Sequence, residues 1–304
     1  MTGTNVRPRT GRSTNAVVSL GRELIRGYGM ATATLRPRPE FLIIGAKRGG
    51  STSFYYDLLQ HSHVSPLFPR PDHLPKAEPT KGIHFFDQNF DRGERWYRAH
   101  LPSRFARSRL IAQVGSPVIT GEASPYYLFH PAAAERAARL LPDANIIAVL
   151  RDPVMRTYSH WKERRRNKRE DLDFVAALEA EDRRIGDAEQ RLTADPAAYS
   201  YAHEQQSYAR QSEYAPALER WYAHFAREHI LVLASEEYYA DPQTALDQAQ
   251  DFLGLPREPL SSSEVRNAAP GEQLDPVIAE RLARRFAPLN TRLVELTGRT
   301  FPWS

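Results

Sequence analysis

Short apolar runs, each followed by a segment of helical periodicity, organise this chain of 304 residues. Continuous runs at 41–44, 145–150 and 230–235 predict strands that are buried on both faces. Two further strands are predicted at "IHFF" (83–86) and early in "SPVITGEASPYYL" (116–128). Because strands alternate with helices, we predict an α/β fold with a central, mostly parallel sheet flanked by helices on both faces.

Helices are predicted between these strands at 51–60, 132–141, 153 onward, 213–225, 242–255 and 276–298. Asp152 can cap the helix that begins at Pro153. Pro288 is expected to break the last helix. The segment 61–82 contains five prolines and predicts a loop, whereas the polar segment 186–212 predicts a surface insertion or lid.

Residues 1–38 are rich in Arg, Thr and Pro and predict a flexible basic tail. They contain a short amphipathic piece, "AVVSLGRELIRGY", so a mobile leader and a peripheral contact with a membrane or partner both stay open. Residues 39–304 are predicted to form a single domain.

The composition, 41% hydrophobic and 26% charged, is that of a globular protein. The absence of cysteine excludes disulfides and thiolate metal sites, and a cytoplasmic location is expected. No apolar run is long enough to span a bilayer, and the N-terminus has no secretory signal pattern. The net charge of +4 suits a highly charged small ligand or a polyanion. No nucleic-acid-binding motif is visible, and the oligomeric state cannot be inferred.

A glycine-rich turn, "GAKRGGSTS" (45–53), joins the first predicted strand to the first predicted helix. Glycines let backbone N–H groups approach a phosphate, and the following helix N-terminus favours negative charge. The nucleotide-hydrolase pattern ends in Gly-Lys-Ser/Thr, but Ser51 stands at the lysine position here. The turn therefore predicts binding of one 5′ anionic group rather than a triphosphate. Ligand contacts are predicted for Lys47, Arg48, Gly49, Gly50, Ser51, Thr52 and Ser53.

A second motif, "RDPVMRTYS" (151–159), follows the predicted strand at 145–150. Arg151 stands at the carboxyl end of that strand, and Ser159 lies two turns into the next helix. A guanidinium fork and a hydroxyl can meet one phosphate beside the strand ends, where α/β sheets bind ligands. This motif therefore predicts a second phosphate site.

With these two motifs, the sequence resembles the sulfotransferase family that uses 3′-phosphoadenosine 5′-phosphosulfate (PAPS), in its heparan-sulfate-type and bacterial branch. The resemblance implies that the first loop holds the 5′-phosphosulfate, while Arg151, Ser159 and Arg266 hold the 3′-phosphate. "KGIHFFD" (81–87) resembles the family segment KExHFFD, and "GEASPYYL" (121–128) resembles EKSPxYF. Segments 212–221, 230–255 and 286–303 extend the resemblance over residues 40–304. A P-loop-like sulfotransferase fold is implied.

Two departures affect the acceptor side. Gly82 replaces the glutamate that serves as the family's usual catalytic base, and Ala123 replaces a lysine. His84 becomes the first candidate for the base, since the pKa of an unperturbed imidazole suits proton transfer. Asp87 could orient His84 or contact the acceptor.

The remaining candidates have supporting roles. Lys47 is predicted to stabilise charge on the leaving phosphate, and Lys81 could reach the sulfonate. Glu122 and Glu78 stay open as other bases. The basic run 162–169 is either a solvated helix face or a site that attracts an anionic acceptor. The aromatic residues that could line an acceptor cleft, most of which are expected in the core, are Tyr126, Tyr127, Trp161, Tyr208 and Trp221.

The predicted reaction is sulfonate transfer from PAPS to a hydroxyl of a carbohydrate, glycolipid or hydroxylated natural product, leaving 3′-phosphoadenosine 5′-phosphate (PAP). No metal is expected. Two alternatives stay open. An atypical P-loop kinase would use Asp152 at the end of its strand, and a catalytically decayed nucleotide-binding protein would explain Gly82 and Ala123.

Overall fold

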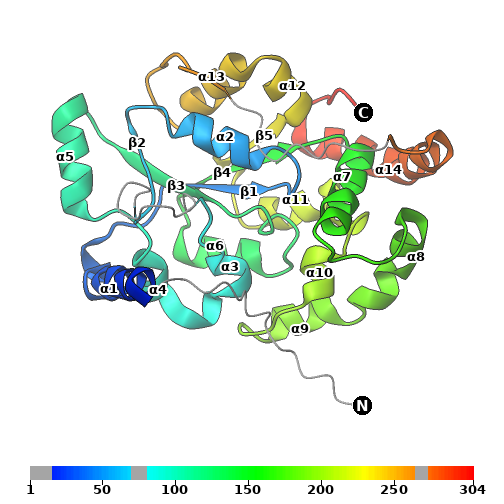
Figure 1. The fold of residues 1–304 in the computed structure, drawn as a ribbon. Helices are drawn as coiled ribbons and strands as arrows, with labels where there is room; N and C mark the ends of the chain where they lie inside the picture. The colour runs from blue at the N-terminus through cyan, green and yellow to red at the C-terminus, as the bar shows by residue number, and fades with distance from the viewer. Residues whose placement is uncertain (1–15, 70–80, 264–272) are drawn as a thin grey trace.

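The structure is a computed structural model that describes residues 16–69, 81–263 and 273–304 (Figure 1). Its five-stranded sheet has the order β2-β3-β1-β4-β5, and every pair of neighbouring strands is parallel. The strands are β1 (Phe41–Gly45), β2 (Val64–Ser65), β3 (Ile119–Ala123), β4 (Asn145–Leu150) and β5 (Ile230–Ala234). The predicted α/β fold is confirmed.

The helices that surround this sheet are α1 (Ala16–Ala31), α2 (Ser51–Leu58), α3 (Phe85–Gln88), α4 (Gly93–Arg98), α5 (Arg104–Val114), α6 (Ala133–Leu140), α7 (Pro153–Arg166), α8 (Phe174–Ile185), α9 (Ala188–Ala194), α10 (Tyr201–Gln205), α11 (Tyr214–Tyr222), α12 (Ser235–Ala240), α13 (Pro242–Phe252) and α14 (Pro276–Thr297). None of the helices in the described ranges is long and apolar enough to cross a membrane.

Alternate residues of each strand enter two separate cores. Phe41 and Ile43 pack with α2, α12 and α13, whereas Leu42 and Ile44 pack with α3, α6, α11 and α14. Figure 1 shows α2, α12 and α13 on one side of the sheet and α3, α6 and α11 on the other. The continuous apolar runs arise because both faces of each strand are covered.

The centre of the sheet creates the place for a ligand. β1 pairs with β3 on one side and with β4 on the other, so the chain connections diverge there. Such a switch point leaves a crevice at the carboxyl ends of the strands. The turn after β1 and the start of α7 after β4 both lie at this edge.

Residues 32–38, which the sequence assigns to a flexible tail, are fixed against the domain. Arg36 is 1% exposed and donates a hydrogen bond to the carbonyl of Leu101. Arg98 donates to the Arg36 carbonyl at 2.6 Å, and Arg38 pairs with Glu94 at 2.9 Å. These contacts hold the chain against α4 before β1 begins.

The strand predicted at 83–86 is wrong, because these residues turn into α3. The N–H of Ile83 donates to Glu122, and the N–H of His84 donates to Ser124, so neither is free for a strand ladder. His84 has a left-handed backbone, with φ 53°, which directs the chain into the helix.

The break predicted at Pro288 is also wrong, because α14 continues through this residue. A proline removes one hydrogen bond, to the carbonyl four residues earlier. Both Pro288 and Arg284 are exposed, so water can solvate that carbonyl. Leu282, Phe286 and Leu293 stay buried on one side of the helix, and this packing outweighs the local cost.

The polar segment 186–212 is more than a surface insertion. It forms α9, α10 and a short turn, and its His203, Tyr208 and Ala209 are fully buried. Polar contacts made inside the protein explain why the segment lacks clear apolar periodicity.

Candidate functional site

The glycine-rich turn after β1 folds back on the end of β4. Ala46 N–H donates to the Val149 carbonyl at 2.7 Å, and Gly49 N–H donates to the Ala46 carbonyl at 2.9 Å. A Cβ on Gly49 would lie 2.5 Å from the Val149 carbonyl oxygen, so only glycine fits. Gly50 has a φ of 93° and precedes α2, whose first N–H groups point back into the turn. This geometry forms an anion-binding cradle.

A group of cations lies beside the cradle. Arg48 Nε donates to Ser159 Oγ at 3.3 Å, which joins the turn to α7. Burial lowers the pKa of Arg48 despite the nearby Glu163, and the positive charge of Arg151 lowers it further. Burial and the charges of Arg151 and Arg48 likewise lower the pKa of Lys162. The structure thus brings the two predicted phosphate motifs together, and a bound anion would relieve the repulsion between these charges.

Lys47 contacts α10. Its Nζ donates to Gln205 Oε1 at 2.7 Å and to the Glu204 backbone carbonyl at 3.3 Å, and lies 3.9 Å from the Glu204 carboxylate. Burial lowers the pKa of Lys47 to about 8. Sequence reasoning missed Glu204 and Gln205, because nothing in the segment 186–212 indicates which of its polar residues turn inward.

Lys81 reaches the same cradle from another direction, since its Nζ donates to Thr52 Oγ1 at 2.5 Å. Burial, reinforced by the charge of Arg48, lowers the pKa of Lys81 to about 8. Ser51 and Ser53 are buried in the first turn of α2, and Tyr239 Oη donates to Ser53 Oγ at 3.4 Å. The predicted contacts from 47 to 53 and Lys81 therefore belong to one site.

Arg156 is a second residue that sequence reasoning left without a role. Its fully buried guanidinium donates to the Lys47 carbonyl at 3.2 Å, to Ser212 Oγ at 2.5 Å and to the Tyr208 carbonyl. These bonds tie the cradle and segment 186–212 to α7. The position of Arg156 within "RDPVMRTYS" could have indicated this role, because a cation so near a buried strand end needs several hydrogen-bond acceptors.

His84 and Asp87 form a pair on the acceptor side. His84 Nδ1 and Asp87 Oδ2 are 2.8 Å apart, and the His84 side chain is 33% exposed whereas Asp87 is buried. Burial opposes the charge on His84, but the charge of Asp87 and their hydrogen bond raise the pKa of His84 overall. Burial raises the pKa of Asp87. Asp87 thus orients the ring of His84 and leaves Nε2 for another contact.

Glu122 holds this pair in place from inside the protein. Its carboxylate accepts hydrogen bonds from Ile83 N–H (2.7 Å), Ser124 Oγ (2.6 Å), Tyr127 Oη (2.7 Å) and Tyr97 Oη (3.3 Å). With 0% exposure and four donors, Glu122 is a structural acceptor rather than a base for a substrate.

Gly82 has no room for the glutamate of the family pattern. A Cβ there would lie 2.5 Å from the Ala123 carbonyl oxygen and 2.8 Å from Ser124 Oγ. The backbone at this position is therefore fitted to glycine, and the missing carboxylate is part of the local structure.

Other predicted residues have different outcomes. The Asp152 carboxylate caps α7 by accepting from the N–H groups of Val154 and Met155, so it is already used where a kinase would need a metal ligand.

Tyr126, Tyr127, Tyr208 and Trp221 are buried core residues, as expected for most of the aromatic set. Trp161 is half-buried. Arg266 and Glu78 lie outside the described residues.

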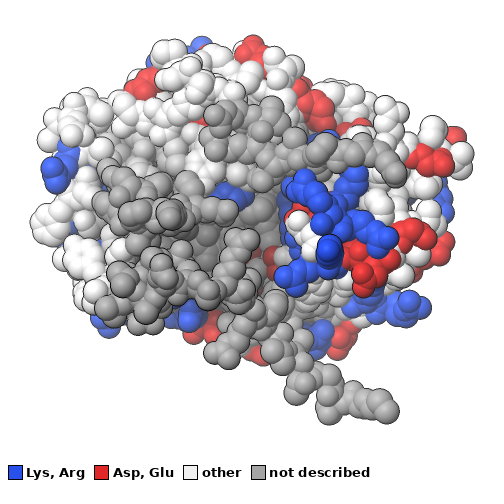
Figure 2. All heavy atoms as spheres, viewed as in Figure 1, with Lys and Arg blue, Asp and Glu red and all other residues white. Residues whose placement is uncertain are grey.

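The basic run 162–169 lies at the end of α7. Figure 2 shows Lys and Arg side chains gathered over this helix. The run is not simply a solvated face, since Arg164 donates to Gln205 Oε1 at 2.6 Å and Arg165 binds the carbonyls of Glu170 and Asp171.

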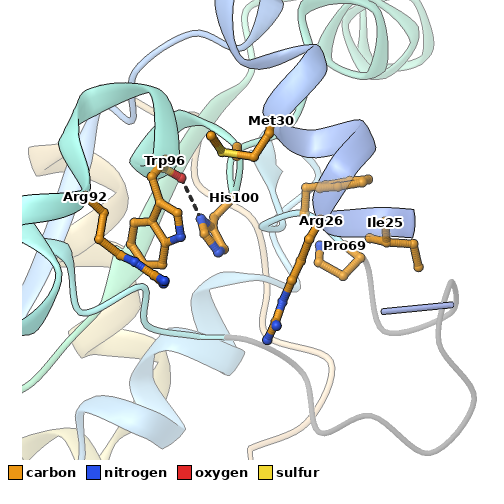
Figure 3. A pocket seen from close by; sticks show the side chains of 9 residues that line it. Ile25, Arg26, Met30, Pro69, Arg92, Trp96 and His100 are labelled. Carbon is orange, nitrogen blue, oxygen red and sulfur yellow. Dashed lines mark hydrogen bonds between the residues drawn. The ribbon is translucent and has the colours of Figure 1, made fainter. Parts of the chain in front are cut away.

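A separate pocket of about 200 Å³ lies between α1 and α4 (Figure 3). Trp96 and Phe68 give it apolar walls, while Arg26 and Arg92 add charge, and Arg92 lies 4.9 Å from the Trp96 ring centre. No residue of the cradle lines this pocket, so it is distinct from the site built around Arg48 and His84.

Comparison with known proteins agrees with this geometry. The family model of the sulfotransferase domain matches residues 38–269. The chain belongs to the sulfotransferase-domain family. The family predicted from the sequence is thereby confirmed.

Three relatives illustrate the match. Human heparan sulfate glucosamine 3-O-sulfotransferase 3B1 is 27% identical over 87% of this chain, which spans 65% of that protein's length. Mouse bifunctional heparan sulfate N-deacetylase/N-sulfotransferase 4 is 30% identical over 71% of this chain and 22% of its own length. The crystal structure of a sulfotransferase from Alicyclobacillus acidocaldarius has a TM-score of 0.60 and 29% identity, covering 86% of this chain and 97% of that one.

Proposed function

We propose that the protein transfers a sulfonate group from PAPS to a hydroxyl of a carbohydrate. The observation that carries this proposal is the junction of Arg48 and Ser159 beside the glycine-rich cradle, with Arg151 adjacent. One nucleotide that bears anionic groups at both its 5′ and 3′ positions needs two neighbouring anion sites. A site for the 5′ phosphosulfate at residues 47–53 and another for the 3′-phosphate at Arg151 and Ser159 meet that need.

The carbohydrate acceptor is proposed from the relatives whose names specify heparan sulfate glucosamine. Glycolipids and hydroxylated natural products remain in the same chemical class, since each presents an alcohol. The His84 side chain is 33% exposed, so an acceptor can approach it while Asp87 fixes its ring, and Glu204, which contacts Lys47 of the cradle, lies near enough to influence the charge on His84.

In the proposed reaction, the acceptor oxygen forms a bond to sulfur, and the bond from sulfur to the oxygen of the 5′-phosphate breaks. Neutral His84 takes the hydroxyl proton through Nε2, and the bonding pair leaves with PAP. Lys47, Lys81 and the N–H groups of the cradle stabilise the charge that grows on the leaving phosphate. The protein mainly supplies positioning and preorganised charge, as in phosphoryl transfer.

Thermal stabilisation by nucleotides tests the proposal directly. A ligand that binds only the folded state raises its stability by mass action. PAP should raise the melting temperature of the full chain more than AMP, ADP or ATP at equal concentration. Equal stabilisation by ADP would contradict the 3′-phosphate site, and stabilisation by ATP that needs Mg²⁺ would favour a kinase. Transfer of labelled sulfonate from PAPS to glucosamine-containing oligosaccharides, compared with simple phenols, then tests the acceptor class.

A further inference from the structure

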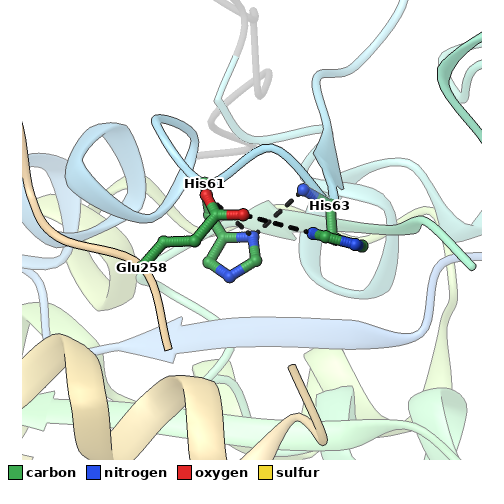
Figure 4. Close-up of side chains that lie close together, drawn as sticks. All are labelled: His61, His63 and Glu258. Carbon is green, nitrogen blue, oxygen red and sulfur yellow. Dashed lines mark hydrogen bonds and ion pairs between the residues drawn. The ribbon is translucent and has the colours of Figure 1, made fainter. Parts of the chain in front are cut away.

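Two histidines and a glutamate meet at the opposite end of α2 from the phosphate cradle (Figure 4). His61 and His63 lie between α2 and β2, while Glu258 follows α13. His61 Nδ1 lies 3.8 Å and His63 Nδ1 lies 3.4 Å from the Glu258 carboxylate. One ligand atom from each residue can be chosen so that all three lie within 4.8 Å of one another.

The outer nitrogen of each ring is held by a polar partner. His61 Nε2 lies 2.8 Å from the Pro256 carbonyl, which can only accept a hydrogen bond, so this nitrogen carries the proton in the neutral ring. His63 Nε2 lies 2.5 Å from Ser116 Oγ. Both rings therefore turn Nδ1 towards Glu258, and histidines that bind metals are characteristically held through their second nitrogen in this way.

Hydrogen bonds link the same atoms in the structure. His61 Nδ1 accepts from the His63 N–H at 3.0 Å, and Ser62 Oγ lies between His63 Nδ1 (2.9 Å) and Glu258 Oε1 (2.5 Å). An ion would replace the Ser62 hydroxyl as the link between the His63 ring and the carboxylate, and it would displace the His63 N–H from the lone pair of His61 Nδ1. Zinc-to-nitrogen distances of about 2.1 Å place two ligands about 3.4 Å apart in a tetrahedron, close to the His63–Glu258 separation.

We propose that His61 Nδ1, His63 Nδ1 and the Glu258 carboxylate bind one divalent transition-metal ion, with Zn²⁺ as the best-suited ion. Two imidazoles and one carboxylate are a typical zinc ligand set, which leaves a fourth position for water. The His61 and His63 side chains are 2% and 10% exposed, so their geometry is restrained. The Glu258 side chain is 30% exposed, which gives an ion a route from solvent.

The ion would have a structural role, because this end of α2 lies away from the reacting groups. It would fasten the segment after α13 to α2. Neighbouring hydrogen bonds join the same two segments. Gln60 and Ser262 exchange hydrogen bonds, and Ser263 donates to Asp57 at 2.6 Å. No sequence motif indicates this cluster, because Glu258 lies 196 residues beyond Ser62. The sequence-based expectation that no metal binds concerned the transfer reaction, which needs none, and a structural ion at this place is a separate proposal.

Untagged full-length protein, freed of metal with EDTA, provides the test. Zn²⁺ should bind with a stoichiometry of one and raise the melting temperature by about 5 °C at a hundredfold excess over the Kd. Glu258→Gln and His63→Gln should each weaken Zn²⁺ affinity by at least about tenfold and reduce the shift at the same Zn²⁺ concentration to about half or less. His224→Ala, which changes an exposed histidine elsewhere, should leave both unchanged.

Co²⁺ provides a second readout that does not depend on the variants folding. Bound in place of Zn²⁺, it should give a visible absorption band of a four-coordinate site in the wild-type chain. No band, no stoichiometric Zn²⁺ and the same melting temperature with and without EDTA would overturn the proposal and leave a cluster held by hydrogen bonds. None of these measurements depends on PAPS or turnover, so the proposed reaction can fail while this site holds, or the reverse.

Discussion

The two parts of the site that we propose to bind the phosphates (the phosphate half) and the acceptor (the acceptor half) are built in different ways. The phosphate half comes from two chain segments that each directly follow a strand, β1 and β4, and these strands are neighbours. The acceptor half depends on His84, which reaches its place through a left-handed turn held by Glu122 and Ser124. The phosphate half thus relies on backbone N–H groups and cations placed by the strand ends, whereas the acceptor half relies on side-chain contacts that hold a turn in place.

This difference explains where the chain departs from its family pattern. Both departures, Gly82 and Ala123, lie in the acceptor half and contact one another, since a Cβ on Gly82 would meet the Ala123 carbonyl. Substitutions in the two halves should therefore separate catalysis from nucleotide binding.

The largest effect is expected for His84→Ala. Removal of a positioned general base typically costs about 10²–10⁴-fold in rate, so turnover should fall by that factor. PAP affinity should stay within about twofold, since His84 lies outside the phosphate half. Turnover can be measured by sulfonate transfer and affinity by calorimetry. Full turnover in this variant would show that another residue is the general base. It would also contradict the proposed division of the site into a phosphate half and an acceptor half.

Arg151→Ala should produce the converse result. Loss of a charge-assisted contact to the 3′-phosphate is expected to cost about 1.5–3 kcal/mol, or roughly 10- to 150-fold in PAP affinity. AMP, which lacks that phosphate, should lose little. Arg139→Ala is the matched control, because Arg139 is exposed on α6 and pairs with Glu135 on the same helix. Equal losses for PAP and AMP would place the 3′-phosphate elsewhere.

Gly82→Glu tests whether the family residue can return to its position. The close Ala123 carbonyl should force a backbone shift that costs about 1–3 kcal/mol of folding free energy. We expect a melting temperature several degrees lower and no gain in turnover. In Gly27→Glu the new side chain enters open space, so stability should change little. A stable and faster Gly82→Glu variant would show that the acceptor half is more adaptable than the structure indicates.

Asp87→Asn should change the pH dependence more than the affinity. Asp87 raises the pKa of His84, and only neutral His84 can accept a proton. Turnover in the wild-type chain therefore falls as pH drops through that raised pKa. The variant should lose activity at a lower pH, because the His84 pKa falls once the negative charge is gone. An unchanged acid limb in the pH–rate profile would show that Asp87 does not influence the pKa of the general base.

The smallest effect concerns the two buried lysines. Lys47 and Lys81 have pKa values lowered to about 8 by burial, so both lose charge in the free protein as pH rises from 7 to 9. PAP affinity should fall several-fold over this range, and binding near pH 8 should take up protons. Lys81→Arg should reduce the pH dependence, because a guanidinium stays charged. Calorimetry in buffers of different ionisation enthalpy measures the proton uptake directly.

The sequence was sufficient to place the two motifs of the proposed phosphate half on their elements because their signals are local. Gly49 and Gly50 follow a buried strand, and Arg151 and Ser159 lie within one short motif, so spacing along the chain placed each residue on its element. The parallel sheet then had to bring the two strand ends to one edge. The helix expected after Pro153 and the buried strands were correct for the same reason.

Features decided by long-range contacts could not be predicted. "IHFF" has the composition of a strand, but Glu122 and Ser124 take up the N–H groups that a strand would pair. The position of Pro288 inside a helix was acceptable only because its side of α14 faces water while Leu282 and Phe286 pack inward.

What the sequence by itself determined is the fold class, the sulfotransferase family and the two phosphate motifs, since these depend on short patterns of glycine, charge and apolar periodicity. Only the tertiary structure decided that Glu204 and Gln205 reach Lys47, that Glu122 is already occupied by four donors, and that His61 and His63 meet Glu258. Most of these contacts join residues far apart in the chain. Polar side chains carry no periodic signal that shows which of them will be turned inward, so packing alone determines their partners.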